Sequence, residues 1–410
     1  MEVVRRPAET APEIPLTAAA VPPAAETVAR PLARPLALLA LGHMVIDIHQ
    51  GALPALLPFL KNAFGLSYAA AGTVILAANL TSSVIQPLFG YLSDRSARRW
   101  LLPGGLVFAT LGMGFTGLVS SYALLLVLVV VAGLGIAAYH PEGYRTAHQV
   151  AGARKATGLA FFSIGGNLGI ALGPPLVAAL VTAFGLPGTL GMLVPGLAMA
   201  GLLALTLPAL APAGQAPAGA GGQAAGRAEM RGAMLLLISV VTLRSWAQLG
   251  LTAFVPFFYV DHLGGEPWLV GPLLFAFLGS GAVGTLVGGP LADRWGPRRY
   301  IVLALLAAAP LASGFVLTRG WPAYLLLAAT GFALVSTFSV TVVLAQTYLP
   351  RQLGMAAGLI VGFAIGTGGV GVALLGWVAD QWGLPVTMGV LAAMPLLGAF
   401  LAALLPEPRP

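Results

Sequence analysis

The sequence contains no cysteine and few charged residues. The missing cysteine excludes disulfides, thiolate metal ligands and cysteine nucleophiles. Only 8% of the 410 residues are charged and 58% are hydrophobic, whereas about 25% of an ordinary soluble domain is charged. So few charges could not cover the surface of a water-soluble chain of this length. The composition therefore predicts an integral membrane protein, and it argues against a soluble enzyme or a nucleic-acid-binding module.

Two stretches are too polar and too rich in Ala, Pro and Gly to form a packed core. We predict that residues 1–34 are a disordered tail, since they carry four Arg and four Glu among Ala and Pro. The run APAGQAPAGAGGQAAGRAE lies within 209–231, which we predict to be a flexible linker. Residues 406–410 form a second short tail.

The remaining residues, 35–208 and 232–405, each have room for six apolar helices joined by short turns. The sequence therefore predicts an all-α integral membrane protein with twelve transmembrane helices in two six-helix bundles. The expected spans are 35–60, 67–92, 101–120, 122–149, 155–181, 186–208, 232–260, 268–292, 300–318, 322–349, 353–379 and 384–405.

The basic residues predict the orientation of these spans. On the side of the two termini the sequence places Arg5, Arg6, Arg30, Arg34, Arg95, Arg98, Arg99, Arg154, Lys155, Arg227, Arg231, Arg294, Arg298, Arg299, Arg351 and Arg409. The opposite side holds only Lys61 and Arg319. Since Lys and Arg accumulate in cytoplasmic loops, both termini are expected in the cytoplasm. The positive net charge then reflects topology and does not indicate a nucleic-acid partner.

A short motif follows the second span and recurs after the eighth. The first copy runs from Gly90 through Asp94, and the second from Gly289 through Asp293, each followed by basic residues. This pair resembles the loop signature of the major facilitator superfamily. The resemblance implies two bundles around a central cavity, working by alternating access. It implies a gate made of Asp94, Arg95, Arg98, Arg145, Asp293 and Arg294.

Longer segments of the first half are similar to one family within that superfamily. They are Gly42 to Arg95, Tyr139-His-Pro-Glu-Gly143 and Phe161 to Gly169. These segments resemble the fosmidomycin resistance protein family, and the similarity covers residues from about 40 to about 405. The resemblance implies a multi-pass drug exporter of the bacterial inner membrane that is driven by protons.

Asp47 is predicted near the middle of the first span, where an ionisable group is costly and usually faces a cavity or a partner. His43 at i−4 and Gln50 at i+3 share its helical face. One interpretation is a proton-coupling site, and the other is a permanent structural pair. His49 falls on a different face and is expected to pack or to bond to a neighbouring helix.

Arg244 is predicted at a similar depth in the seventh span, with Gln248 one turn later. The guanidinium fork suits carboxylates, phosphates and phosphonates. Arg244 is therefore a candidate anion-binding residue, and the alternative is a fixed counter-ion for Asp47 or Glu142.

A second polar group, His140, Glu142 and Arg145, falls in the cytoplasmic half of the fourth span, where Pro141 should kink the helix. His140 and Glu142 are candidates for proton coupling beside Asp47. Arg145 is assigned to the gate, and a gate contact with Asp94 is the alternative for the Glu142–Arg145 pair.

Further polar residues could line the cavity or bond between helices, and the sequence leaves both open. With Gln50, Arg244 and Gln248, the predicted substrate-binding residues are completed by Asn79, Gln86 and Asn167. The glycines around Gly166 suit close helix packing, and without a preceding strand they do not form a phosphate-binding loop.

The favoured function is a secondary antiporter that exports an organic anion or drug against inward protons. It would need no cofactor and no metal, only a proton gradient, a small anionic substrate and a lipid bilayer, and it would act as a monomer. Proton-coupled uptake of a small organic acid uses the same residues and stays open. A membrane receptor without transport activity is a less favoured alternative, as is an enzyme, for which no nucleophile–base pair is present.

Overall fold

The computed structural model describes residues 33–95, 98–151, 155–210, 230–350, 355–356, 358–364 and 366–407. Every regular element in these ranges is helical. The predicted disordered tail and flexible linker lie almost entirely outside the described residues, as do residues 408–410 of the second tail.

The first half of the chain contains seven α-helices and three short helical segments of other types. Its elements are α1 (Ala33–Phe64), α2 (Tyr68–Asn79), the π-helix η1 (Leu80–Val84), α3 (Gln86–Arg95), α4 (Leu101–Gly114), α5 (Tyr122–Val150), α6 (Lys155–Phe184), the 3-10 helix η2 (Leu186–Met192), α7 (Leu193–Thr206) and the 3-10 helix η3 (Leu207–Leu210).

The second half follows the same plan. Its elements are α8 (Arg231–Phe257), the π-helix η4 (Phe258–His262), the 3-10 helix η5 (Pro267–Leu269), α9 (Val270–Trp295), α10 (Pro297–Leu317), α11 (Trp321–Tyr348), the π-helix η6 (Gly358–Ala364) and α13 (Gly368–Ala403).

Ten helical stretches in the described residues are long and apolar enough to cross a membrane. One of them, Gly362–Ala403, contains two predicted spans, because α13 bends at Gly383, whose φ of 82° is not helical. The apolar helix α4 is shorter and ends at Gly114, where the predicted span continued to residue 120. With α4 and both parts of α13 included, the predicted twelve-segment all-α fold is confirmed.

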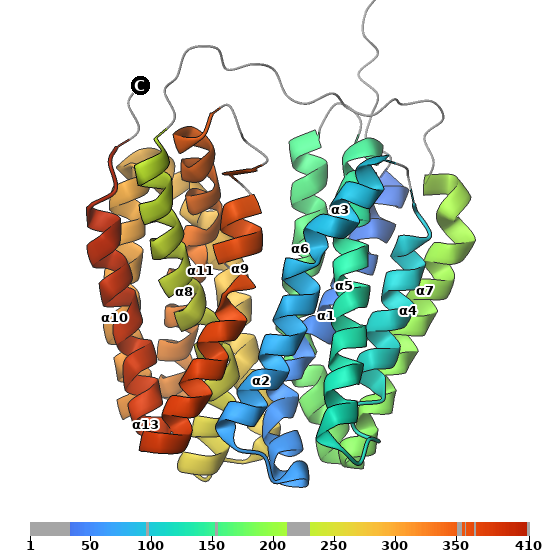
Figure 1. The fold of residues 1–410 in the computed structure, drawn as a ribbon, viewed down its shortest axis with the longest axis horizontal. Helices are drawn as coiled ribbons and strands as arrows, with labels where there is room; N and C mark the ends of the chain where they lie inside the picture. Colours follow the sequence, from blue (N-terminus) through green and yellow to red (C-terminus); the bar gives the residue numbers. More distant parts are fainter. Residues whose placement is uncertain are drawn as a thin grey trace, which may run out of the picture.

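The helices form two groups, α1–α7 and α8–α13 (Figure 1). The groups meet where α2 packs on α13 and α6 packs on α9. At the first junction the backbones nearly touch, since a methyl group on Gly376 would lie 2.5 Å from the carbonyl oxygen of Tyr68. In Figure 1, α2 begins at the lower end, away from the described ends of the chain.

Within the first group, α1 and α6 pack through glycine. A methyl group on Gly165, Gly169 or Gly173 would come within 2.0 to 2.4 Å of a carbonyl oxygen of α1. These glycines recur every four residues and so form one stripe along α6, as small residues do at close membrane-helix contacts. This packing buries His43 and Asp47 of α1 against Gly166 and Gly169 of α6.

Candidate functional site

Asp47 lies between two histidines in the interior of the first bundle. One carboxylate oxygen, Oδ2, is 3.3 Å from Nε2 of His43, one turn earlier on α1. The other, Oδ1, is 3.1 Å from Nε2 of His140 on α5. His43 and Asp47 are each only 3% exposed, and His140 is half-buried. We call His43, Asp47 and His140 the triad.

The far nitrogens of both histidines contact backbone carbonyl groups. Nδ1 of His43 is 2.9 Å from the carbonyl oxygen of Phe162 on α6. Nδ1 of His140 is 2.9 Å from the carbonyl oxygen of Ile136, one turn earlier on α5. Because a carbonyl oxygen can only accept, each Nδ1 is the donor and carries a proton. Each ring is thus fixed with Nε2 toward Asp47, as supporting hydrogen bonds fix a functional histidine.

Aromatic rings and one glycine surround the triad. The His43 ring stacks on Phe162 with a centroid distance of 4.1 Å, and the Tyr144 ring meets it edge-on at 5.8 Å. A methyl group on Gly166 would lie 2.6 Å from Nε2 of His43 and 2.7 Å from Oδ2 of Asp47. Gly166 therefore provides the space in which carboxylate and imidazole meet.

The three ligand atoms of the triad lie within 4.8 Å of one another. At this spacing they could share protons or hold a single metal ion. His43 and His140 were both predicted as proton-coupling candidates, and the structure brings them from two helices to the carboxylate of Asp47.

Arg244, on α8, is 2% exposed. Its Nη1 donates to Oε1 of Gln248 at 2.9 Å, and its Nη2 donates to Oγ of Ser245 at 3.4 Å. Its Nε has no hydrogen-bond partner in the described part of the chain. None of the ion pairs among the described residues includes Arg244. Arg244 is thus a buried cation held by neutral groups, and in this conformation it is a counter-ion of neither Asp47 nor Glu142.

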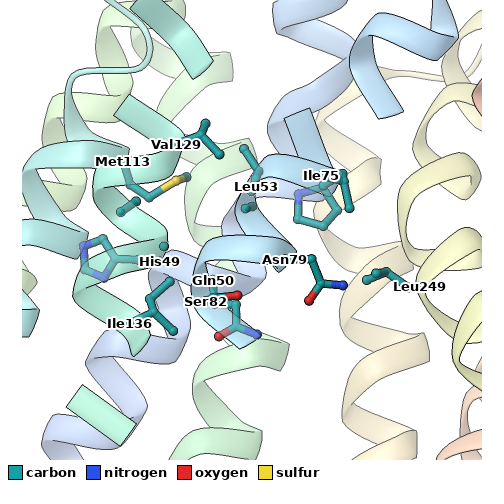
Figure 2. A pocket seen from close by; sticks show the side chains of 14 residues that line it. His49, Gln50, Leu53, Ile75, Asn79, Ser82, Met113, Val129, Ile136 and Leu249 are labelled. Atoms are coloured by element: carbon teal, nitrogen blue, oxygen red, sulfur yellow. The ribbon is translucent and has the colours of Figure 1, made fainter. Parts of the chain in front are cut away.

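A pocket lies between α1, α2, η1, α4 and α5 (Figure 2). Its lining on α1 begins at His49, two positions after Asp47. It leaves about 510 Å³ of empty space, part of it open to the outside. Gln50, Asn79 and Ser82 supply polar groups to its wall, and His49 lies at its edge. The second bundle contributes Leu249, the residue that follows Gln248.

The predicted substrate-binding residues are therefore only partly brought together. Gln50 and Asn79 share the pocket, whereas Arg244 and Gln248 bond to each other and do not line it. Gln86 at the start of α3 and Asn167 in α6 do not line it.

Glu142 takes part in a separate cluster on α5. Its side chain is fully buried, and Oε1 lies 3.1 Å from Nη1 of Arg145. Thr146 donates to the same oxygen at 3.5 Å, and the backbone amide of Arg98 donates to Oε2 at 3.4 Å. The structure thus places Glu142 with residues predicted for the gate.

The remaining predicted gate residues are less well defined. The side chains of Asp94 and Arg95, at the end of α3, lie outside the described part of the structure. Their counterparts Asp293 and Arg294 are exposed near the end of α9.

A polar cluster that we did not predict joins the bundles where α2 begins. Lys61 of α1 lies 3.2 Å from Oδ2 of Asp261 in η4, and the hydroxyl of Tyr68 donates to the same oxygen at 2.9 Å. Asp380 of α13 accepts from the backbone amides of Tyr68 and Ala69. We call Lys61, Tyr68, Asp261 and Asp380 the latch. Its only signal in the sequence is a charge at the end of each of three apolar spans.

Two bundles of membrane-spanning helices, with buried ionisable side chains on α1, α5 and α8, are typical of a multi-pass transporter. The chain belongs to the Major Facilitator Superfamily, whose sequence profile matches residues 39–360 and, in an overlapping second match, 275–410. A small-molecule substrate follows from this membership.

Individual relatives agree with the family assignment. The chain is 35% identical to the uncharacterized MFS-type transporter YfnC of Bacillus subtilis, over 91% of this chain and 92% of the relative. It is 31% identical to the fosmidomycin resistance protein of Escherichia coli, over 91% of this chain and 93% of that protein. The predicted resemblance is thereby confirmed.

Solved structures share the fold at low identity. A bacterial homolog of the human lysosomal transporter Spinster, in an inward-facing and unoccupied conformation, superposes with a TM-score of 0.75 at 16% identity, over 91% of this chain and 96% of that one. The nucleoside transporter NupG superposes with a TM-score of 0.72 at 14% identity, over 90% of this chain and 99% of that one.

Proposed function

We propose that this protein exports an organic anion, of the phosphonate class represented by fosmidomycin, in exchange for protons across the bacterial inner membrane. The substrate class is suggested by the 31% identical fosmidomycin resistance protein. The proton coupling rests on the triad, and the preference for an anion rests on Arg244.

The observation that carries the proposal is the choice of partners for Asp47. A lysine or arginine beside this carboxylate would make a permanent ion pair, because both stay charged at neutral pH. The partners are instead His43 and His140, and among side chains histidine has the unperturbed pKa nearest to neutral pH. An aspartate paired with two such groups can gain and lose protons during a cycle.

Arg244 supports an anionic substrate. A charge in the membrane interior needs a compensating partner, and the described partners of Arg244 are neutral. A phosphonate or carboxylate bound against Arg244 would supply the missing charge and could pair with the guanidinium fork.

The position of the latch supports an inward-facing state. We infer from the distribution of Lys and Arg that both termini are cytoplasmic. The latch then closes the external side, because it lies at the end opposite the described chain ends. The Spinster homolog, which shares this fold, was solved in an inward-facing conformation.

These elements give a cycle for exchange. In the inward-facing state an anion from the cytoplasm binds near Arg244. The latch opens, the anion leaves to the outside, and protons from the external side bind the triad. Return to the inward-facing state delivers the protons to the cytoplasm, which resets the site.

The test is transport in proteoliposomes with an imposed pH gradient. An inward proton gradient should drive fosmidomycin out, and Asp47→Asn, which keeps shape but cannot titrate, should abolish the dependence on pH. Glu266→Gln, an exposed carboxylate change in the loop before η5, is the matched control and should transport normally. Accumulation of the anion in the direction of the proton flow would show uptake by symport and refute export. Wild-type coupling in Asp47→Asn would refute the proton site.

A further inference from the structure

The two histidines of the triad each present a nitrogen lone pair beside Asp47. Nδ1 of each ring donates to a backbone carbonyl oxygen, of Phe162 for His43 and of Ile136 for His140. In a neutral ring of this tautomer, Nε2 carries only a lone pair. Both Nε2 atoms lie next to the carboxylate, at 3.3 Å and 3.1 Å. Three electron-pair donors from two helices therefore converge at one buried place.

One of the carboxylate oxygens has no hydrogen-bond donor. Oδ1 of Asp47 is buried and has no hydrogen-bond partner among the described residues, although Nε2 of His140 is its neighbour. The ion pairs that Asp47 makes within the described chain involve only the two histidines. An ionised carboxylate between neutral imidazoles gives the site a negative charge, which is costly at membrane depth without a cation. The arrangement favours a cation that accepts several lone pairs at once.

The distances within the triad suit a small metal ion. In a tetrahedral site with bonds of about 2.0 to 2.1 Å, neighbouring ligand atoms are about 3.3 Å apart. The two N···O distances, 3.3 Å and 3.1 Å, agree with this separation, and the three ligand atoms all lie within 4.8 Å of one another. Two imidazoles and one carboxylate suit Zn²⁺ and related transition metals, whereas Mg²⁺ and Ca²⁺ prefer oxygen ligands.

The surroundings of the triad also fit a metal site. A metal-binding histidine almost always donates its other ring N–H to a carbonyl group, a carboxylate or water, and both histidines do so here. Gly166 keeps clear the space in which a methyl group would lie 2.6 Å from Nε2 of His43 and 2.7 Å from Oδ2 of Asp47. The side chain of His140 is 12% exposed, so an ion can reach the ligand atoms from this side.

We propose that the triad binds one divalent transition-metal ion of the zinc class. The ligands are Nε2 of His43, Nε2 of His140 and the carboxylate of Asp47. Three protein ligands leave a further coordination position for water or an anion, which a purely structural zinc site does not have. The bound ion joins α1 to α5 and stabilises the first bundle. This inference concerns a ligand of the triad and does not depend on the proposed export.

The first test is metal binding by the full-length wild-type chain in detergent, purified with a tag that contains no histidine. The chain has no cysteine and five histidines, so few other side chains can bind Zn²⁺. Calorimetric titration with Zn²⁺ should give one ion per chain, and saturation should raise the melting temperature. Pulsed electron spin resonance of the Cu²⁺-loaded chain should show two coordinated imidazoles. Absence of stoichiometric binding, or a Cu²⁺ signal without two imidazoles, would overturn the proposal and leave the proposed export standing.

The second test assigns the ligands. Loss of a residue that only supports a ligand already lowers metal affinity by about 10- to 100-fold, so His43→Gln and His140→Gln should each weaken Zn²⁺ binding by about 100-fold or more. His262→Gln, at an exposed position in η4, is the matched control and should bind as wild type does. Wild-type affinity in either triad variant would refute its histidine as a ligand and overturn the three-ligand site. If a variant fails to fold, the imidazole count in wild type decides.

Discussion

The carboxylate of Asp380 accepts a hydrogen bond from the backbone amide of Tyr68, 2.8 Å away, across the junction of the two bundles. Its second oxygen accepts from the amide of Ala69 at 2.9 Å, while Ser67 accepts from the next amide, of Ala70. The first turn of α2 is therefore capped jointly by its own N-cap residue and by an aspartate of the other bundle. A negative charge is favourable at this end of a helix.

Asp380→Asn should favour the conformation in which this side is open. Asparagine has one acceptor oxygen and no charge, so it can replace only part of the cap. For an exposed, charge-assisted contact we expect a loss of about 1 kcal/mol, or about a fivefold change in the conformational ratio. Because the chain has no cysteine, spin labels can be attached at Asn62→Cys on α1 and Gln381→Cys on α13. Electron spin resonance then reports the distance between the two bundles on this side. Glu266→Gln is the charge-matched control, and an unchanged distance distribution in Asp380→Asn would contradict the role of the latch.

Gly166→Ala should disturb the triad. The added methyl group would lie 2.6 Å from Nε2 of His43, whose ring is held by the Phe162 carbonyl, so relaxation must break a contact. We expect a loss of about 1 to 3 kcal/mol in stability and at least a tenfold fall in proton-driven export. Gly201→Ala, where a methyl group meets nothing within 4 Å, is the control for both thermal unfolding and transport. Normal export by Gly166→Ala would show that the tight fit around Asp47 is not required.

Arg244→Ala should weaken the binding of anionic substrates by about 30-fold or more, which corresponds to about 2 kcal/mol or more for a buried charge contact. Arg244→Lys should recover only part of this affinity, since lysine keeps the charge but not the two-pronged fork. Calorimetric titration with fosmidomycin measures the effect, and Arg319→Lys, at an exposed turn, is the control. If Arg244→Ala binds the drug as tightly as wild type, Arg244 is not the anion site.

Arg145→Ala should destabilise the first bundle, because it removes an ion-pair partner of the fully buried Glu142. The Arg145 side chain is 25% exposed, so we expect about 2 kcal/mol, below the range for a fully buried pair. Adding Glu142→Gln should restore part of the lost stability, as judged by the melting temperature in detergent. A double variant less stable than Arg145→Ala would show that Glu142 is stabilised mainly by other contacts.

The spans could be predicted because their signal is local. A bilayer requires about 20 apolar residues for each crossing, and the observed helices begin and end close to the predicted limits. The end of α4 was predicted too late in the chain, because Gly117 approaches Leu186 after the helix ends, a contact between segments distant in sequence. The latch was missed for the same reason, since its partners come from three separate regions of the chain.

The candidate site was predictable within one helix and not between helices. His43 and Asp47 are four residues apart, so their contact follows from helical geometry. His140 and Glu142 were grouped because they are near in sequence, but residues that are two positions apart on a helix do not share a face. The structure accordingly directs His140 to Asp47 and Glu142 to Arg145.

The glycine stripe of α6 has a consequence for movement within the first bundle. Gly165, Gly169 and Gly173 bring the backbone of α6 against α1, so we expect these two helices to shift together. His43 and Asp47 both belong to α1, whereas His140 belongs to α5. A shift of α5 relative to α1 would therefore lengthen the contact between His140 and Asp47 and leave the contact between His43 and Asp47 unchanged.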